Sequence, residues 1–232
     1  MVEPGDDRTI ASVHADFPEW HRGRPCYALW AIDVDIPAVR AASDGLRGHL
    51  ADFLLPGYRR QPHVTLHLCG FPGSVGLADD YPPAALARQV AALTAAAPRP
   101  FAIDLGTAAT FTSAAYLAVG DREGGIAALR QALGGGGAAE GGFPYVPHVT
   151  VGFYRREFPL AEVLAALAAW PGPGSLSLAV DRLTLMSYRS GVIAGELAAV
   201  GDFHLASGRF HWRDGGKDAA GFAGFSAGPT AG

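Results

Sequence analysis

Two copies of one short motif carry the side chains best suited to chemistry. A Pro-His-Val-Thr sequence occurs twice, and it supplies His63 with Thr65 and His148 with Thr150. Apolar residues around each copy indicate strands, in which alternate side chains point to opposite faces, so each histidine shares a face with its threonine. Two imidazoles can act as general acid and general base near neutral pH. Two hydroxyls can donate to the non-bridging oxygens of a phosphate, so the pattern indicates phosphodiester hydrolysis by a route that needs no metal.

The surroundings of the motif also repeat. A lone histidine on a strand is more often a structural residue than a catalyst. Here the order strand, helix, His-x-Thr strand, helix, strand occurs twice, and Tyr27 precedes His63 by about as many residues as Tyr116 precedes His148. We interpret this as an internal duplication, which favours the functional interpretation of both motifs.

The elements that must position these residues follow from apolar periodicity and from proline and glycine breaks. Helices are expected at 37–55, 83–97, 125–133 and 160–170, and strands at 26–34, 62–68, 101–105, 115–119, 147–153, 176–186 and 196–205. The predicted fold class is α+β and bilobal, with duplicated β/α halves whose antiparallel sheets face a central cleft. We expect an irregular lead-in at 1–24, a two-lobed domain at 25–208 and a disordered Gly/Ala-rich tail at 209–232.

Composition narrows the class of partner. The net charge is -4 and Lys217 is the single lysine, which argues against broad binding to duplex nucleic acid and favours a small or terminal substrate. Two cysteines are too few for a disulfide scaffold, and neither a signal segment nor a membrane span is evident. The sequence therefore predicts a cytoplasmic, globular and monomeric protein without membrane contact.

The paired motifs resemble those of the two-histidine phosphoesterase superfamily, over roughly residues 25–206. The nearest branch is the 2′-5′ RNA ligase and 2′,3′-cyclic phosphodiesterase family, and the segment 27–31 resembles the first strand of its cyclic nucleotide phosphodiesterases. The resemblance implies that His63 and His148 are the acid–base pair and that Thr65 and Thr150 bind phosphate, without a cofactor or metal. The implied substrate is a 2′,3′-cyclic phosphate on an RNA end or small nucleotide, with 2′-5′ RNA ligation as a further activity. By analogy His148 activates water and His63 protonates the leaving 3′ oxygen, although the reverse assignment stays open.

Further substrate contacts are expected from aromatic and basic side chains. Trp30 or Tyr145 can stack a base or ribose, with core packing an equal alternative for Trp30. Four arginines lie near strand ends where a phosphate can be reached, namely Arg59, Arg60, Arg155 and Arg189. Among these we select Arg59 and Arg189 as candidate contacts.

His67 has no counterpart in the second motif, where Gly152 takes its place. On an unbroken strand it shares a face with His63 and Thr65, so a role in contacting substrate is the favoured interpretation. One alternative is a metal-dependent hydrolase in which His63, His67 and His148 bind zinc. Another is a non-catalytic module that binds RNA or a nucleotide.

Overall fold

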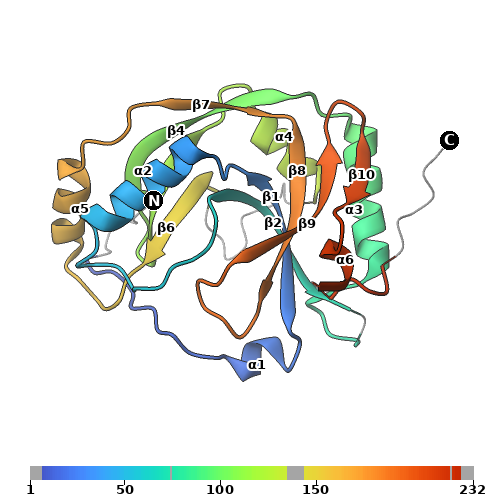
Figure 1. The fold of residues 1–232 in the computed structure, drawn as a ribbon, viewed down its shortest axis with the longest axis horizontal. Coiled ribbons are helices and arrows are strands. Elements are labelled where there is room, and N and C mark those ends of the chain that lie inside the picture. Colours follow the sequence, from blue (N-terminus) through green and yellow to red (C-terminus); the bar gives the residue numbers. More distant parts are fainter. Residues whose placement is uncertain (1–6, 74, 135–143, 220, 226–232) are drawn as a thin grey trace.

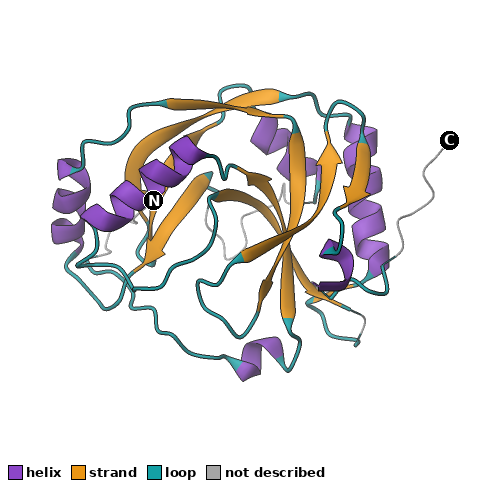
Figure 2. Cartoon of the chain, viewed as in Figure 1, coloured by secondary structure: helices purple, strands orange, loops and turns teal. Residues whose placement is uncertain are grey.

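Two β-sheets form the centre of the molecule, with the helices outside them (Figures 1 and 2). The computed structural model describes residues 7–73, 75–134, 144–219 and 221–225. The first sheet has the order β10-β9-β8-β1-β2-β3, and the second has the order β6-β5-β4-β7. Their strands are β1 Cys26–Asp33, β2 His63–Pro72, β3 Asp80–Tyr81, β4 Phe101–Thr110, β5 Ala114–Gly120, β6 His148–Phe153, β7 Leu176–Val180, β8 Arg182–Arg189, β9 Leu197–His204 and β10 Arg209–Trp212. Except for the short parallel pair of β2 with β3, the pairs are antiparallel.

The helices of the described residues are α1 Pro18–His21, α2 Pro37–His49, α3 Pro83–Ala96, α4 Gly125–Ala132, α5 Leu160–Ala169 and α6 Gly216–Ala219. The helices α2 to α5 lie close to the positions expected, whereas the short α1 and α6 fall in the lead-in and the tail, where no helix was expected. A proline opens both α2 and α3, where its missing N–H is not needed. The helix α2 ends earlier than predicted because the following segment pairs with the end of β6: Leu54 bridges Tyr154, and the Leu55 amide donates to Phe153. None of the helices in the described part of the chain is long and apolar enough to cross a membrane.

The two halves of the chain are interleaved. The strand β4 follows the first half in sequence but joins β5 in the second sheet, and β8 follows the second half but joins β1 in the first sheet. The helices cross over as well, because α2 contacts β6 and α4 contacts β2. Buried residues of both sheets belong to one continuous core cluster. The predicted α+β fold of two antiparallel-dominated sheets is confirmed.

The strand register reveals how the duplicated halves correspond. His63 lies opposite Asp33 and Thr65 opposite Ala31 on β1, whereas His148 lies opposite Ala118 and Thr150 opposite Tyr116 on β5. Tyr116 therefore corresponds to Ala31, and the expected equivalence with Tyr27 was wrong by four residues. The residues that pair in register are equally spaced in the two halves, 34 residues from Ala31 to Thr65 and 34 from Tyr116 to Thr150. The error came from matching two tyrosines whose distances to the motif histidine differ, 36 residues for Tyr27 and 32 for Tyr116.

The tail expected to be disordered from 209 onward is folded over much of its length. Strand β10 extends the first sheet by pairing with β9, and Arg213 binds Asp202 through two hydrogen bonds of 2.7 and 2.9 Å. Phe222 and Phe225 are buried in the core. These aromatic side chains outweigh the Gly/Ala-rich background that suggested disorder, because each removes a large apolar surface from water. Residues 220 and 226–232 lie outside the described residues.

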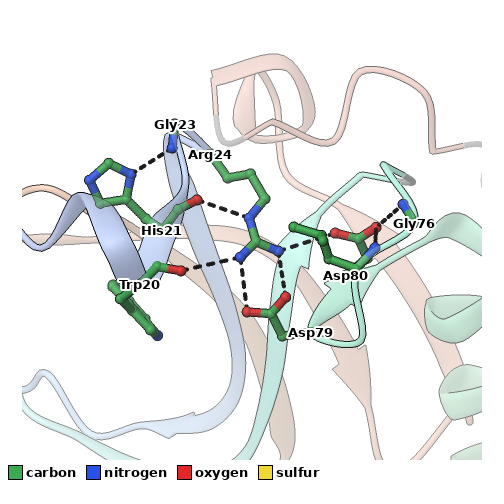
Figure 3. A network of polar contacts seen from close by, with 8 residues as sticks. Trp20, His21, Gly23, Arg24, Gly76, Asp79 and Asp80 are labelled. Atoms are coloured by element: carbon green, nitrogen blue, oxygen red, sulfur yellow. Dashed lines mark hydrogen bonds and ion pairs between the residues drawn. The ribbon is translucent and has the colours of Figure 1, made fainter.

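The lead-in is anchored by Arg24 (Figure 3). Residues 7–17 lack regular structure apart from a bridge between Arg8 and Pro159, and α1 follows. The Arg24 side chain is 9% exposed, and its guanidinium binds both oxygens of Asp79 at 2.6 and 2.9 Å, while one nitrogen also reaches Asp80 at 3.2 Å. Its carbon centre lies 3.7 Å from the ring centroid of Phe71. Charge pairing and stacking thus hold the lead-in against the loop before β3.

Candidate active site

Both motif histidines are oriented by the same local hydrogen bond. The Nδ1 atom of His63 lies 2.8 Å from the carbonyl oxygen of Gln61, and Nδ1 of His148 lies 2.7 Å from that of Val146. Each carbonyl stands two residues before its histidine. A carbonyl oxygen only accepts, so Nδ1 carries the proton in each ring, and Nε2 of the neutral imidazole keeps its lone pair. Each motif thus presents Nε2 as a proton acceptor.

The two motif strands lie against each other, although they belong to different sheets. Strands β2 and β6 are in contact, and in Figure 1 both lie near the middle of the molecule, where the two sheets meet. A positive charge on His148 lowers the pKa of His63, which places the two imidazoles within electrostatic reach. The structure therefore brings together the two residues that the sequence selects as an acid–base pair.

Burial keeps both imidazoles neutral in the free protein. His63 is 7% exposed, and desolvation lowers its pKa to about 4, with the charges of Arg60 and His148 acting in the same direction. Burial also lowers the pKa of His148. An anion bound between the rings would oppose these effects, because a nearby negative charge favours the protonated form. Binding of an anion at this place would therefore be coupled to the uptake of a proton.

Arg60 is a cationic side chain close enough to His63 for its charge to affect that imidazole. Its guanidinium carbon lies 4.2 Å from the ring centroid of Tyr188, and its charge lowers the pKa values of His63 and Tyr58. Its Nε is buried without a hydrogen-bond partner, and no carboxylate of the described residues pairs with it. Its neighbour Arg59 is exposed, with its backbone amide bound to Ala194. Its partial burial and its contact with Tyr188 favour Arg60 over the exposed Arg59.

Aromatic rings surround His148. Phe111 lies edge-on to the imidazole with centroids 4.9 Å apart, and Tyr116 lies 5.3 Å from it. The two aromatic rings are themselves stacked at 4.3 Å. Tyr116 also lines a hollow of about 1120 Å³ between β4, β5 and the residues after α5. The sequence search did not select Phe111 or Tyr116 as site residues, because only the register of β5 places Tyr116 opposite Thr150.

Each motif threonine is half-buried and contacts a tyrosine. The Tyr145 hydroxyl donates to the carbonyl oxygen of Thr65 at 2.7 Å, and the Thr150 side chain lies near enough to the Tyr58 hydroxyl to lower the pKa of that tyrosine. Thr65 pairs with Ala31 on β1, and Thr150 pairs with Tyr116 on β5. Tyr145, expected to stack on a base, therefore has its hydroxyl committed to the protein backbone.

Two residues predicted from the sequence to contact substrate, Trp30 and Arg189, have other surroundings in the structure. Trp30 is fully buried, and its indole N–H donates to Gln89 Oε1 at 2.9 Å, so its role is core packing and not stacking on a substrate. Trp30 belongs to the main core cluster, whereas its neighbours Leu29 and Ala31 belong to a smaller cluster. Arg189 is exposed at the end of β8 opposite Cys26, whereas its neighbour Tyr188 contacts Arg60.

His67 is displaced from the face of Thr65 by a β-bulge. Thr65 pairs with Ala31 but His67 pairs with Trp30, so Leu66 is an extra residue in β2 and the strict alternation of side chains is broken. The corresponding Gly152 supports this placement, because a Cβ there would lie 3.0 Å from the buried side chain of Leu54. The assumption of an unbroken strand was wrong.

The metal alternative gains no support from this geometry. Within the described ranges, no three His, Cys, Asp or Glu side chains come together in a way that could hold a metal ion. The three histidines His63, His67 and His148 lie within those ranges and form no such group.

Comparison with known protein families agrees with the interpretation of the two motifs. The family model of the 2′-5′ RNA ligase superfamily matches residues 36–192, which is more than half of the chain and includes both motifs. The chain belongs to the 2′-5′ RNA ligase superfamily. This result confirms the resemblance to two-histidine phosphoesterases inferred from the motifs.

Solved structures with this fold are distant in sequence. TT0787 of Thermus thermophilus is 18% identical with a TM-score of 0.53, over 78% of this chain and 98% of that one. LigT of E. coli, solved in complex with 3′-AMP, is 21% identical with a TM-score of 0.44, over 78% of this chain and 98% of LigT. No curated protein matches the sequence. The likeness to TT0787 shows that the fold is shared, while the superfamily membership rests on the family model.

Proposed function

We propose that this protein is a metal-independent phosphodiesterase that hydrolyses 2′,3′-cyclic phosphates on an RNA end or a small nucleotide. The observation that carries the proposal is the matched orientation of His63 and His148. Each ring is held through Nδ1 by a backbone carbonyl, which leaves both Nε2 atoms free to exchange protons. A protein that only bound its ligand would have no need for two such titrating groups.

The reaction follows from those roles. The cyclic phosphate binds with its non-bridging oxygens at the hydroxyls of Thr65 and Thr150, and the Arg60 guanidinium offsets its negative charge. One neutral imidazole takes a proton from water at Nε2 as the water oxygen forms a bond to phosphorus. The other, protonated at Nε2 in the complex, gives its proton to the 3′ oxygen as the bond between that oxygen and phosphorus breaks. The product keeps the phosphate on the 2′ oxygen.

The surroundings fit a small or terminal substrate. Phe111 and Tyr116 provide aromatic surface beside His148, on which a base can stack. The chain has one lysine and a net charge of -4, so a long track for an RNA backbone is not indicated. Formation of a 2′-5′ linkage, the same chemistry with a ribose hydroxyl in place of water, would be a secondary activity.

A substrate panel tests the proposal. The purified protein is incubated with each 2′,3′-cyclic nucleotide and with an RNA that ends in a cyclic phosphate, with and without EDTA. We expect hydrolysis that EDTA does not reduce. Loss of turnover with EDTA would point to a metal-dependent hydrolase, and tight binding of the cyclic phosphates without turnover would point to a binding module.

A further inference from the structure

Both motifs are followed by a β-bulge at the same position. In β2 the extra residue is Leu66, between Thr65 and His67, and in β6 it is Val151, between Thr150 and Gly152. Each bulge lies three residues after the motif histidine. A bulge leaves a backbone group outside the ladder and re-aims the side chains beside it, so the bulges set how the motif threonines face the site.

An arginine from the opposite half binds the carbonyl of each bulge residue. Arg47 on α2 donates through Nε to the carbonyl oxygen of Val151 at 3.1 Å. Arg130 on α4 donates through Nη1 to the carbonyl oxygen of Leu66. The helix between the strands of one half thus satisfies the bulge in the motif strand of the other half, consistent with the contacts of α2 with β6 and of α4 with β2.

Each arginine lies near a tyrosine, and this tyrosine also contacts the motif of the opposite half. The Arg130 guanidinium lies 3.6 Å from the ring centroid of Tyr145, whose hydroxyl binds the Thr65 carbonyl at 2.7 Å. The Arg47 guanidinium lies 5.4 Å from the ring centroid of Tyr58, whose hydroxyl lies beside the Thr150 side chain and interacts with it.

The tyrosines are placed by the segments that lead into the motif strands. Tyr58 precedes the first motif yet packs against Phe153 at the end of β6, with ring centroids 5.6 Å apart. Tyr145 precedes the second motif and contacts β2. Burial raises the pKa of Tyr58 to about 12, so its hydroxyl stays protonated and able to donate at neutral pH.

We propose that these two arginine–tyrosine pairs, Arg47 with Tyr58 and Arg130 with Tyr145, form a crossed brace that positions each His-x-Thr motif from the opposite half of the chain. The brace makes the geometry of one motif depend on residues that belong to the other, so that the two phosphate-binding hydroxyls keep a fixed separation. Its members are positioning residues and take no part in bond making. The proposal rests on the proposed phosphate-binding role of Thr65 and Thr150.

The crossed arrangement is tested by a double-mutant cycle. Tyr58→Phe removes one hydroxyl and little else, and we expect kcat/KM for 2′,3′-cyclic AMP to fall about fivefold, the usual effect of one lost hydrogen bond. In a Thr150→Val background the same substitution should cause no further loss, because its partner is already absent. In a Thr65→Val background it should cause the full loss, because those two residues act separately.

A matched control and a substrate-free readout complete the test. Tyr81→Phe removes another buried hydroxyl, which binds Gln89 at 2.7 Å, and should leave kcat/KM unchanged. In NMR spectra of the free protein, Tyr58→Phe should shift the backbone amides of 148–153 more than those of 63–65. Equal losses in the two threonine backgrounds, or amide shifts confined to the first motif, would overturn the brace. An absence of wild-type turnover, with the amide shifts as expected, would instead count against the proposed function alone.

Discussion

The guanidinium of Arg60 lies over the ring of Tyr188, 4.2 Å from its centroid, on the side of the molecule that carries His63. The stacking holds a cation beside a buried imidazole without neutralising it, since no carboxylate of the described residues pairs with Arg60. Such an arrangement disfavours a protonated His63 in the free protein. It favours the entry of an anion, which offsets the charge of Arg60 and stabilises a proton on His63.

Substitution of Arg60 should weaken the handling of phosphate. For Arg60→Gln we expect kcat/KM on 2′,3′-cyclic AMP to fall about 10- to 100-fold, as for the loss of a charge-assisted hydrogen bond. Arg88→Gln, at an exposed position of α3, controls for the change in net charge and should have little effect. A loss that is equal in the two variants would show that only overall charge matters.

The protonation of His63 should respond to phosphate and to Arg60. We expect NMR titration of the free protein to give a His63 pKa of about 4. Inorganic phosphate should raise this pKa, because a bound anion stabilises the imidazolium. Arg60→Gln should also raise it, because a nearby positive charge is removed. A His63 pKa near 6.5 that does not respond to phosphate would contradict the site as described.

The same burial makes stability depend on pH. The His63 pKa is about 4 when folded and about 6.5 when unfolded, so the unfolded chain binds the proton first. The contribution of neutral His63 is complete above pH 6.5 and is lost as the pH falls from 6.5 towards 4, by about 3 kcal/mol. In His63→Gln the free energy of unfolding should fall less steeply over this interval. Parallel curves for the wild type and the variant, from denaturant unfolding, would refute the assignment.

The folded tail predicts a large effect of an aromatic side chain near the C-terminal end of the described residues. Phe222 is fully buried, and its ring contacts Tyr81, Trp212 and Phe225. Phe222→Ala should lower the free energy of unfolding by about 3–5 kcal/mol, the range for truncating a buried phenylalanine. Leu164→Ala, at a side chain that is 47% exposed, should cost much less. A neutral Phe222→Ala would mean that the tail is not part of the core.

The central features were predictable because they depend on local sequence. The motif strands, their paired histidines and the helices opened by proline are encoded by alternation, periodicity and single residues, and the family model agrees with the interpretation of the motifs. The features that were missed depend on long-range pairing. The bulges at Leu66 and Val151 exist only in the register between strands, so His67 was assigned to the wrong face.

Other errors have similar causes. Trp30 lies on the core face of β1, and which face of a fully apolar strand is covered depends on α3, whose Gln89 binds it. Arg59 and Arg60 are adjacent, and only the placement of Tyr188 from a distant strand selects Arg60. Phe222 and Phe225 are too sparse to indicate order by themselves, yet they complete the core that the rest of the chain leaves open.

The account is tested most directly by the turnover of 2′,3′-cyclic AMP, followed by ³¹P NMR, in the wild type, His63→Gln and His148→Gln, with folding verified by circular dichroism. We predict a single 2′-monophosphate product from the wild type. Each substitution should lower kcat by about 100- to 10,000-fold, the range for loss of a general acid or base. Hydrolysis at the wild-type rate in either folded variant would contradict two-histidine catalysis.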